Sequence, residues 1–172
     1  MKPDEHKIKR ILRAYGNQDP DVGYHQGFPN IVTLLLHKIS PEASTEFDIS
    51  SGIISPSEED VFFCLFRIMH SLNWREHYLK PFSRGPYLVK EIDSLIQFHI
   101  PVLYAKIESE GLKEIIMENF YNYTIFSLCC NEHIPIDVTM RIFEVVIFEG
   151  LGDVSLVRLI LYMLMIMEED IM

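Results

Sequence analysis

Apolar residues recur along most of the chain every three or four positions, the spacing that places side chains on one face of an α-helix. Residues 5–16 show this pattern with basic residues between the apolar ones, and residues 30–39 repeat it. In residues 58–72 the apolar positions cover more than one face, which predicts a central helix. Further helices are predicted over residues 86–99, 102–110, 114–130, 137–148 and 154–168.

Residues that start and stop helices stand at the edges of these segments. Residues 57–60 (SEED) resemble a capping box before an apolar run. Pro101 and Pro135 stand where a first-turn proline belongs. Gly111 and Gly150 stand where a terminating glycine belongs. The helix boundaries are therefore predicted by local chemistry as well as by periodicity.

One stretch, residues 40–57, has no periodicity and is rich in Ser, Pro, Gly and acidic residues. We expect a long surface loop there and not a domain boundary, because the preceding segment is too short to fold alone. The β-branched run at residues 145–147 could form a strand, but it lies inside a helical pattern. The sequence thus predicts one all-α domain over residues 1–172, an irregular bundle of about eight helices.

Composition narrows the functional classes. Hydrophobic residues make up 48 % of the 172 residues, enough for a large core, and the formal net charge is −10. The basic residues gather only at Lys7, Lys9, Arg10 and Arg13, within one amphipathic helix. Because a protein that binds phosphate backbones usually shows a basic face, we expect no nucleic-acid partner.

The three cysteines, Cys64, Cys129 and Cys130, lie inside apolar runs, which is typical of buried thiols in a reducing compartment. Residues 1–9 are polar and charged, unlike a signal peptide. The longest apolar run, residues 154–167, is interrupted by an arginine and falls short of the ~20 residues that a bilayer requires. We therefore expect a cytoplasmic protein without a transmembrane segment.

Conventional catalytic and metal-binding patterns are missing from the sequence. Of the seven histidines, His70 and His77 lie seven positions apart, and His99 and His133 are isolated. None has a Cys, Asp or Glu at a recurring ligand spacing, so no metal site is expected. No phosphate-binding loop, dinucleotide turn or nucleophile elbow is present.

The most distinctive polar residue is Gln26, which lies between Tyr24 and Gly27 on a predicted irregular turn between two apolar helices. Residue types alone favour a structural role, in which the amide bonds to the backbone of its own loop. Glutamine is a poor general base, and where it serves catalysis it orients a water molecule by donating and accepting hydrogen bonds. Hydrolysis of GTP is a reaction in which an amide does this.

The region around Gln26 resembles a known family. Residues 10–15 (RILRAY), a short acidic loop and residues 23–27 (GYHQG) resemble the R-x-L-x-A-Y and G-Y-x-Q-G blocks of TBC domains, which activate Rab-type GTPases. Later blocks of the family agree in the same order. The W-F-x-x-L-F, L-P-x-x, R-I-W-D and x-E-G blocks correspond to residues 120–126, 134–137, 141–144 and 148–150.

The resemblance covers the chain from about Ile8 to its C-terminus and implies a TBC-type helical fold. Two departures, Phe-Tyr for Trp-Phe at residues 120–121 and Phe-Glu for Trp-Asp at residues 143–144, keep similar volume or charge. They leave the expected fold unchanged.

By position, Gln26 corresponds to the catalytic glutamine of the family, which orients the attacking water in the GTPase active site. Tyr24 and Gly27 correspond to its neighbours, whose aromatic packing and small size would set the shape of the loop, and Gly23 completes this support. The resemblance implies a Rab-family small GTPase as partner and a role in vesicle trafficking. The magnesium ion and the nucleotide belong to that GTPase, so no cofactor is expected on this chain.

The arginine finger of the family lies in an I-x-x-D-x-x-R motif upstream of the helix that contains Arg10, and this chain starts too late to contain it. The nearest similar stretch, residues 134–141, places Arg141 one position too far along, so Arg141 is expected to pack or form a salt bridge. Arg10 and Arg13 match helix positions of the family and are candidate partner-binding residues. We expect the TBC domain to be N-terminally incomplete and nearly inactive alone, because the finger is worth about 10³- to 10⁵-fold in rate.

Three hypotheses follow. In the first, which we favour, the chain is part of a GTPase-activating domain that uses Gln26 and associates with membranes only through its GTPase. In the second, it is a non-catalytic TBC-like scaffold that binds a small GTPase or another protein and is indifferent to Gln26→Ala. In the third, it is a helical domain whose partner is unrelated to GTPases.

Overall fold

The computed structural model describes residues 5–39, 57–82, 84–130 and 134–171, and these ranges are helical without any strand. The predicted all-α class is confirmed. The α-helices are α1 (Glu5–Gln18), α2 (Phe28–Ile39), α3 (Glu58–Ser71), α4 (Arg84–His99), α5 (Pro101–Ser109), α6 (Lys113–Phe120), α7 (Ile136–Glu149) and α8 (Asp153–Ile171). Two shorter elements are the 3-10 helix η2 (Trp74–His77) and the π-helical turn η3 (Tyr121–Phe126).

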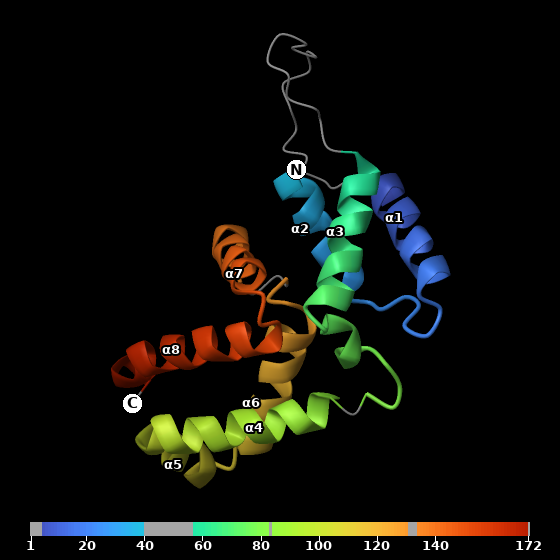
Figure 1. The fold of residues 1–172 in the computed structure, drawn as a ribbon. Coiled ribbons are helices and arrows are strands. Elements are labelled where there is room, and N and C mark those ends of the chain that lie inside the picture. The colour runs from blue at the N-terminus through green and yellow to red at the C-terminus, as the bar shows by residue number, and fades with distance from the viewer. Residues whose placement is uncertain (1–4, 40–56, 83, 131–133, 172) are drawn as a thin grey trace.

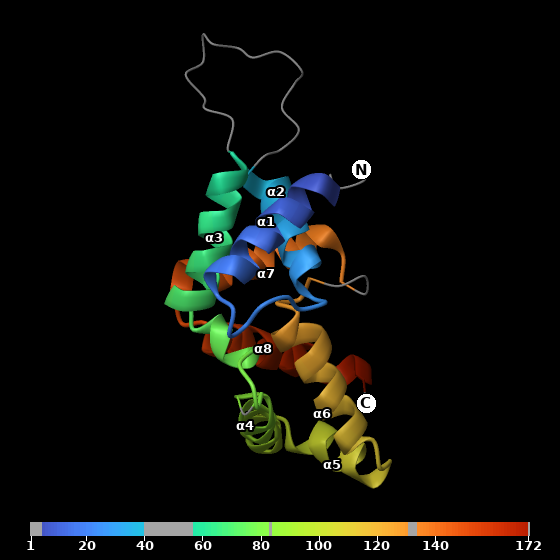
Figure 2. The same ribbon diagram turned by 90° about the vertical axis from the view of Figure 1, so that its right-hand side faces the viewer.

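The helices form two groups, and Figure 1 and Figure 2 show α1, α2 and α3 above α4, α5 and α8, with α7 at the level of the first three. In the first group α1, α2 and α3 pack on one another. In the second, α4 contacts α5, α6 and α8, and α7 packs on α8. Because η2 follows α3 and contacts α4, while η3 contacts both α4 and α8, these two short elements lie at the junction of the groups.

The largest fully buried side chains lie near this junction. Trp74 and Tyr78 come from η2 and the residue after it, Tyr15 from α1 and Phe28 from the start of α2. Phe28 and Tyr78 pack edge to face, with ring centroids 4.7 Å apart. The aromatic core therefore lies directly beside the connection between α1 and α2.

Most of the residues that were predicted to begin or end a helix lie at helix ends in the structure. The Ser57 hydroxyl accepts from the Asp60 N–H at 3.3 Å, and the Asp60 carboxylate accepts from the Ser57 N–H at 2.7 Å. This is the expected capping box at the start of α3. Pro101 is in the first turn of α5, whereas Pro135 is the N-cap of α7, one position earlier than expected. Gly150 ends α7 with a left-handed backbone.

The predicted helix over residues 114–130 is wrong in its second half. The α-helix α6 ends at Phe120 and widens into the π-helical turn η3, after which Leu128 and Cys129 adopt positive φ. Backbone carbonyls here bond to side chains from distant elements instead of continuing the helix. The Tyr78 hydroxyl donates to the Phe126 carbonyl at 2.6 Å, and the Thr139 hydroxyl donates to the Cys129 carbonyl at 3.0 Å.

Two other details differ from the sequence prediction. The element η2 was not predicted, because four residues are too few to show periodicity. Helix α2 starts at Phe28, earlier than expected, with the Phe28 and Asn30 N–H groups bonding to the His25 and Gly27 carbonyls. The predicted loop at residues 40–57 lies outside the described residues except for Ser57.

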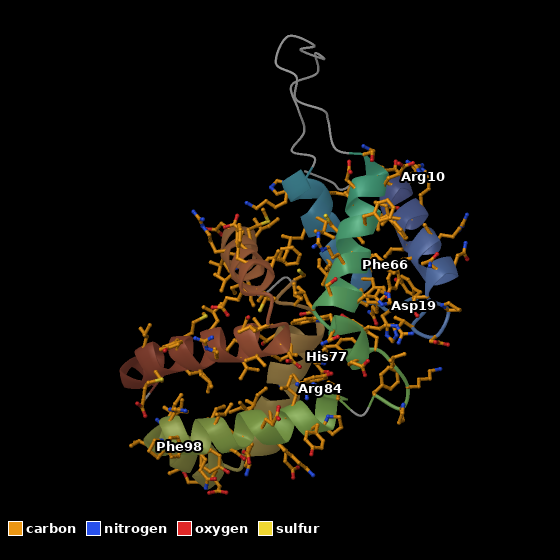
Figure 3. All side chains as sticks on the ribbon, in the orientation of Figure 1. Arg10, Asp19, Phe66, His77, Arg84 and Phe98 are labelled. Carbon is orange, nitrogen blue, oxygen red and sulfur yellow. The ribbon has the colours of Figure 1, made fainter. Side chains whose placement is uncertain are left out.

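A buried polar cluster ties the second group of helices together. His77, 1 % exposed, places Nδ1 3.1 Å from the Tyr121 hydroxyl and Nε2 3.4 Å from an Asp153 oxygen. The Arg84 guanidinium donates to Asp153 at 2.7 and 2.9 Å, and Figure 3 shows Arg84 beside His77. Burial raises the pKa of the Tyr121 hydroxyl to about 12, so this hydroxyl stays protonated at neutral pH.

The three cysteines are free thiols, with Cys129 and Cys130 buried and Cys64 half-buried. Burial raises the pKa of the Cys129 thiol to about 12, so little nucleophilic thiolate forms there at neutral pH. None of the described helices is long and apolar enough to cross a bilayer.

Candidate functional site in the loop between α1 and α2

The predicted site residue Gln26 lies in the connection between α1 and α2, which we call the glutamine loop (residues 19–27). Figure 1 and Figure 2 both show this connection at the end of α1 nearest the second group of helices. Gln26 is exposed and sits in a turn that leads straight into α2. The predicted location of the glutamine, on an irregular turn between two apolar helices, is confirmed.

The loop begins at a buried carboxylate. Asp19 is 4 % exposed and follows α1 directly. Its Oδ2 accepts from the Tyr15 hydroxyl at 3.0 Å and from Arg75 Nε at 2.7 Å, and its Oδ1 accepts from Arg75 Nη2 at 2.8 Å. Such a two-point pairing of guanidinium and carboxylate fixes direction as well as distance. Asp19 is thereby held in one orientation by an arginine from η2.

The charges around Asp19 keep it ionised. The Arg75 hydrogen bonds lower the pKa of the Asp19 carboxyl against the opposing effect of burial. Burial and the bond to Asp19 raise the pKa of the Tyr15 hydroxyl, which therefore remains a donor. On α3, His70 stacks on Phe66 and places Nε2 3.6 Å from Asp19 Oδ2, and Figure 3 shows Phe66 and Asp19 in this region.

The backbone of the loop turns at Gly23. Its φ is +66°, in the left-handed region that favours glycine, and its N–H donates to the Asp19 carbonyl at 2.8 Å. A residue with a side chain would be strained at this position. Gly27 has no close neighbour among the described residues that a side chain would meet, so their packing does not require a glycine at that position.

The side chain that packs the loop onto the core is His25 and not Tyr24. Tyr24 is 64 % exposed, so the expected aromatic packing by Tyr24 is not seen. The His25 ring instead contacts four aromatic rings, with centroids 4.9 to 6.1 Å away. These belong to Phe28, Tyr78, Phe82 and Phe126.

The inward direction of His25 turns its neighbours outward. Residues 23–25 are irregular backbone, and the exposed Tyr24 and Gln26 flank the half-buried His25 on either side. Phe82, 40 % exposed and with a φ of +61°, packs edge to face on the His25 ring, with ring centroids 6.0 Å apart. Gln26 is therefore exposed to solvent, as is Tyr24 two positions before it.

His25 should make the stability of the protein depend on pH. Burial lowers the pKa of the ring, and the nearby Lys80 ammonium lowers it further against a bond to the Val22 carbonyl. In an unfolded chain a histidine titrates near about 6.5, so below that pH the unfolded state binds more protons than the folded one. The contribution of His25 to stability is therefore present above about pH 6.5 and is lost as the pH falls.

We expect the free energy of unfolding, measured in urea between about pH 5 and pH 8, to fall more steeply with acid in the wild type than in His25→Phe. The phenyl ring keeps the aromatic packing and removes the titratable group at position 25, which is the only difference between the two sequences. Parallel pH profiles for the two proteins would contradict this assignment.

The arginines that the sequence singled out lie away from the glutamine loop or are paired. Arg10 donates to Glu58 at 2.5 and 2.9 Å and links α1 to α3, and Figure 3 shows it toward the end of α1 that lies away from Asp19. Arg13 is exposed on α1. Arg141 is exposed on α7 and pairs with Glu144 at 3.2 Å, which agrees with the salt-bridge role predicted for it.

The site also contains residues that sequence reasoning missed. Asp19 and Arg75 fix the start of the loop, and His25 and Phe82 form its packing. The signal for Asp19 was present, since an aspartate four positions after a tyrosine at a helix end can accept its hydroxyl bond. Arg75 had no such signal. Within the described ranges, no three His, Cys, Asp or Glu side chains are grouped in a way that could hold a metal ion.

Comparison with known proteins shows the family to which the chain belongs. The sequence profile of the Rab-GTPase-TBC domain matches residues 2–172. The chain belongs to the Rab-GTPase-TBC domain family, whose general function is activation of Rab GTPases. The match confirms the resemblance found in the sequence motifs.

Similar proteins carry names that agree with this family. The chain is 26 % identical over 144 residues to the GTPase-activating protein GYP5 of Saccharomyces cerevisiae, covering 84 % of the chain and 14 % of that protein. It is 28 % identical over 152 residues to the human ecotropic viral integration site 5 protein homolog, covering 88 % and 16 %. It is 25 % identical over 141 residues to the Rab GTPase-activating protein eat-17 of Caenorhabditis elegans, covering 82 % and 14 %.

The chain thus spans only a small part of the length of these relatives, 14 to 16 %. No solved structure matches it.

Proposed function

We propose that this chain is a GTPase-activating domain for a Rab-type small GTPase, and that Gln26 is its catalytic glutamine. The observation that carries the proposal is the geometry of the glutamine loop. Gln26 is exposed and can enter a partner's site, while Asp19 at the start of the loop and His25 directly before Gln26 are tied to the core. A structural glutamine, whose amide bonds only to its own loop, would not need to be exposed to solvent on an anchored loop.

The proposed chemistry belongs to the partner. Water attacks the γ-phosphorus of GTP, the bond to the β–γ bridging oxygen breaks, and GDP and inorganic phosphate result. The Gln26 carbonyl oxygen would accept a hydrogen bond from that water, and its amide N–H would donate toward the reacting groups. The magnesium ion and the nucleotide come with the GTPase. This chain would contribute orientation, which is the main source of catalysis in phosphoryl transfer.

The test is single-turnover hydrolysis of GTP by a panel of Rab GTPases, with this chain and its Gln26→Ala form side by side. Acceleration by the wild type that disappears in the variant supports the proposal. Acceleration that survives the substitution contradicts the role of Gln26. Absence of acceleration by both forms contradicts catalytic competence of residues 1–172.

A non-catalytic scaffold is the second candidate, and one observation favours it. Arg10 and Arg141 are both engaged on the chain's own surface, and Gln26 alone does not offset the charge that develops on the phosphoryl oxygens. A scaffold would bind the GTP-loaded GTPase with equal affinity before and after Gln26→Ala and leave hydrolysis unchanged. In either case we place the protein in the cytoplasm, in vesicle trafficking, and at membranes only through its GTPase.

A further inference from the structure

Element η2 and the residue after it contact the glutamine loop region at two places. Arg75, within η2, binds Asp19 at the start of the loop. Tyr78, which follows η2, packs on His25 and Phe28 at the end of the loop, with centroids 4.9 and 4.7 Å away. In a 3-10 helix, side chains three positions apart lie on the same face, so Arg75 and Tyr78 both point toward the loop.

The contact that Arg75 makes with the loop consists of charged hydrogen bonds, which fix its direction. Besides its two bonds to Asp19, Arg75 Nη2 donates to Asp21 Oδ2 at 3.2 Å. One guanidinium therefore holds both carboxylates of the turn that leads to Gly23. The side chain of Arg75 is 23 % exposed and that of Asp19 is 4 % exposed, so the pair is shielded from water.

The backbone bonds of the loop start from the same residue. The Asp19 N–H donates to the Tyr15 carbonyl at 2.9 Å, and the Asp19 carbonyl accepts from the Gly23 N–H at 2.8 Å. The orientation of Asp19 thus fixes the left-handed turn at Gly23, three positions before Gln26.

We propose that Arg75 is a positioning residue for Gln26: through Asp19 and Asp21 it sets the direction from which the Gln26 amide enters the site of a GTP-loaded Rab-type GTPase. The inference rests on the proposed function of this loop. Arg75 itself does not touch the reacting atoms. Because a lysine cannot form the two-point contact, Arg75→Lys keeps the charge and loses the orientation.

The test compares Arg75→Lys with Arg84→Lys in the same chain. Arg84 forms an equally close pair with Asp153, away from the glutamine loop, and so is a matched control for losing a guanidinium. The first measurement is amide hydrogen exchange at Gly23. We expect Arg75→Lys to speed this exchange about tenfold and Arg84→Lys to leave it unchanged, with both proteins folded by circular dichroism.

The second measurement is single-turnover GTP hydrolysis with the Rab GTPase that the wild-type chain accelerates best. We expect Arg75→Lys to lose most of the acceleration that the wild-type chain gives at saturation, because a small misplacement of a positioning group strongly slows the reaction. The concentration of chain for half-maximal rate should change less than about twofold, since Arg75 contributes orientation and not a contact with the GTPase. Arg84→Lys should match the wild type in both.

The outcomes separate the two claims. Unchanged exchange at Gly23 in Arg75→Lys overturns the inference, whatever the kinetics. Faster exchange with an unchanged maximal rate also overturns it, because the loop would then be ordered by Arg75 without consequence for hydrolysis. A wild-type chain that accelerates no GTPase overturns the proposed function. Faster exchange in Arg75→Lys would then show only that Arg75 orders the loop, and the positioning role would be overturned together with the proposed function.

Discussion

Replacing Gln26 with alanine is expected to remove most of the acceleration of GTP hydrolysis that saturating chain still produces, because a preorganised hydrogen-bonding group at the reacting centre is lost. The side chain is exposed, so folding should be unaffected. The measurement is the maximal single-turnover rate with an accelerated Rab GTPase. Binding, followed separately with a nonhydrolysable GTP analogue, should change less than about twofold, because one amide contributes little to a protein interface.

The matched control for this prediction is Gln97→Ala, which removes an exposed glutamine from α4. It should leave both the rate and the binding unchanged. A second variant, Gln26→Asn, keeps the amide but shortens its reach by one methylene, and it should show a partial loss. Equal rates for wild type and Gln26→Ala, with intact binding, would contradict a catalytic role for Gln26 and favour the non-catalytic scaffold.

Replacing Gly152 with alanine should destabilise the protein strongly. Gly152 has a φ of +61°, and a Cβ there would lie 2.4 Å from the Leu72 carbonyl oxygen. The left-handed backbone costs about 1–2 kcal/mol for a residue with a side chain. Pushing a backbone carbonyl aside adds about 1–3 kcal/mol, for a total of about 2–5 kcal/mol.

The control for Gly152 is its near neighbour Gly150. It has a similar φ of +68°, but no atom of the described residues lies within 4 Å of the position that a Cβ would take. Gly150→Ala should therefore cost only the backbone part, about 1–2 kcal/mol. Urea unfolding of the two variants measures the difference. Equal losses would mean that the connection between α7 and α8 moves away from Leu72 without strain.

The helices were predictable because each one buries a stripe of its own sequence. In α1 the stripe is set by residues three and four apart, and the buried residues are the predicted Ile8, Ile11, Leu12 and Tyr15. The π-helical turn η3 was not predictable in this way. Its shape follows from partners elsewhere in the chain, such as Tyr78, whose hydroxyl bonds to Phe126.

The candidate site was predictable only in part. The motif located Gln26 and Gly23, because local sequence determines where a turn interrupts two apolar helices. It assigned the aromatic packing to Tyr24, whereas the structure has His25 facing the core. Which of two adjacent side chains faces inward depends on where Tyr78 and Phe126 lie, and no local pattern records that.

The glutamine loop also has a consequence for the order of folding. Its own residues are close together in sequence, but Asp19 meets Arg75 across 56 positions, and Asn30 just after the loop bonds to the Cys130 carbonyl across 100. Contacts between such distant residues form after local helices, because closing a long chain segment costs entropy before the contact compensates for it. The glutamine should therefore take up its final place late, once η2 and η3 have docked. A chain that is helical but not yet fully assembled would present no ordered amide to a GTPase.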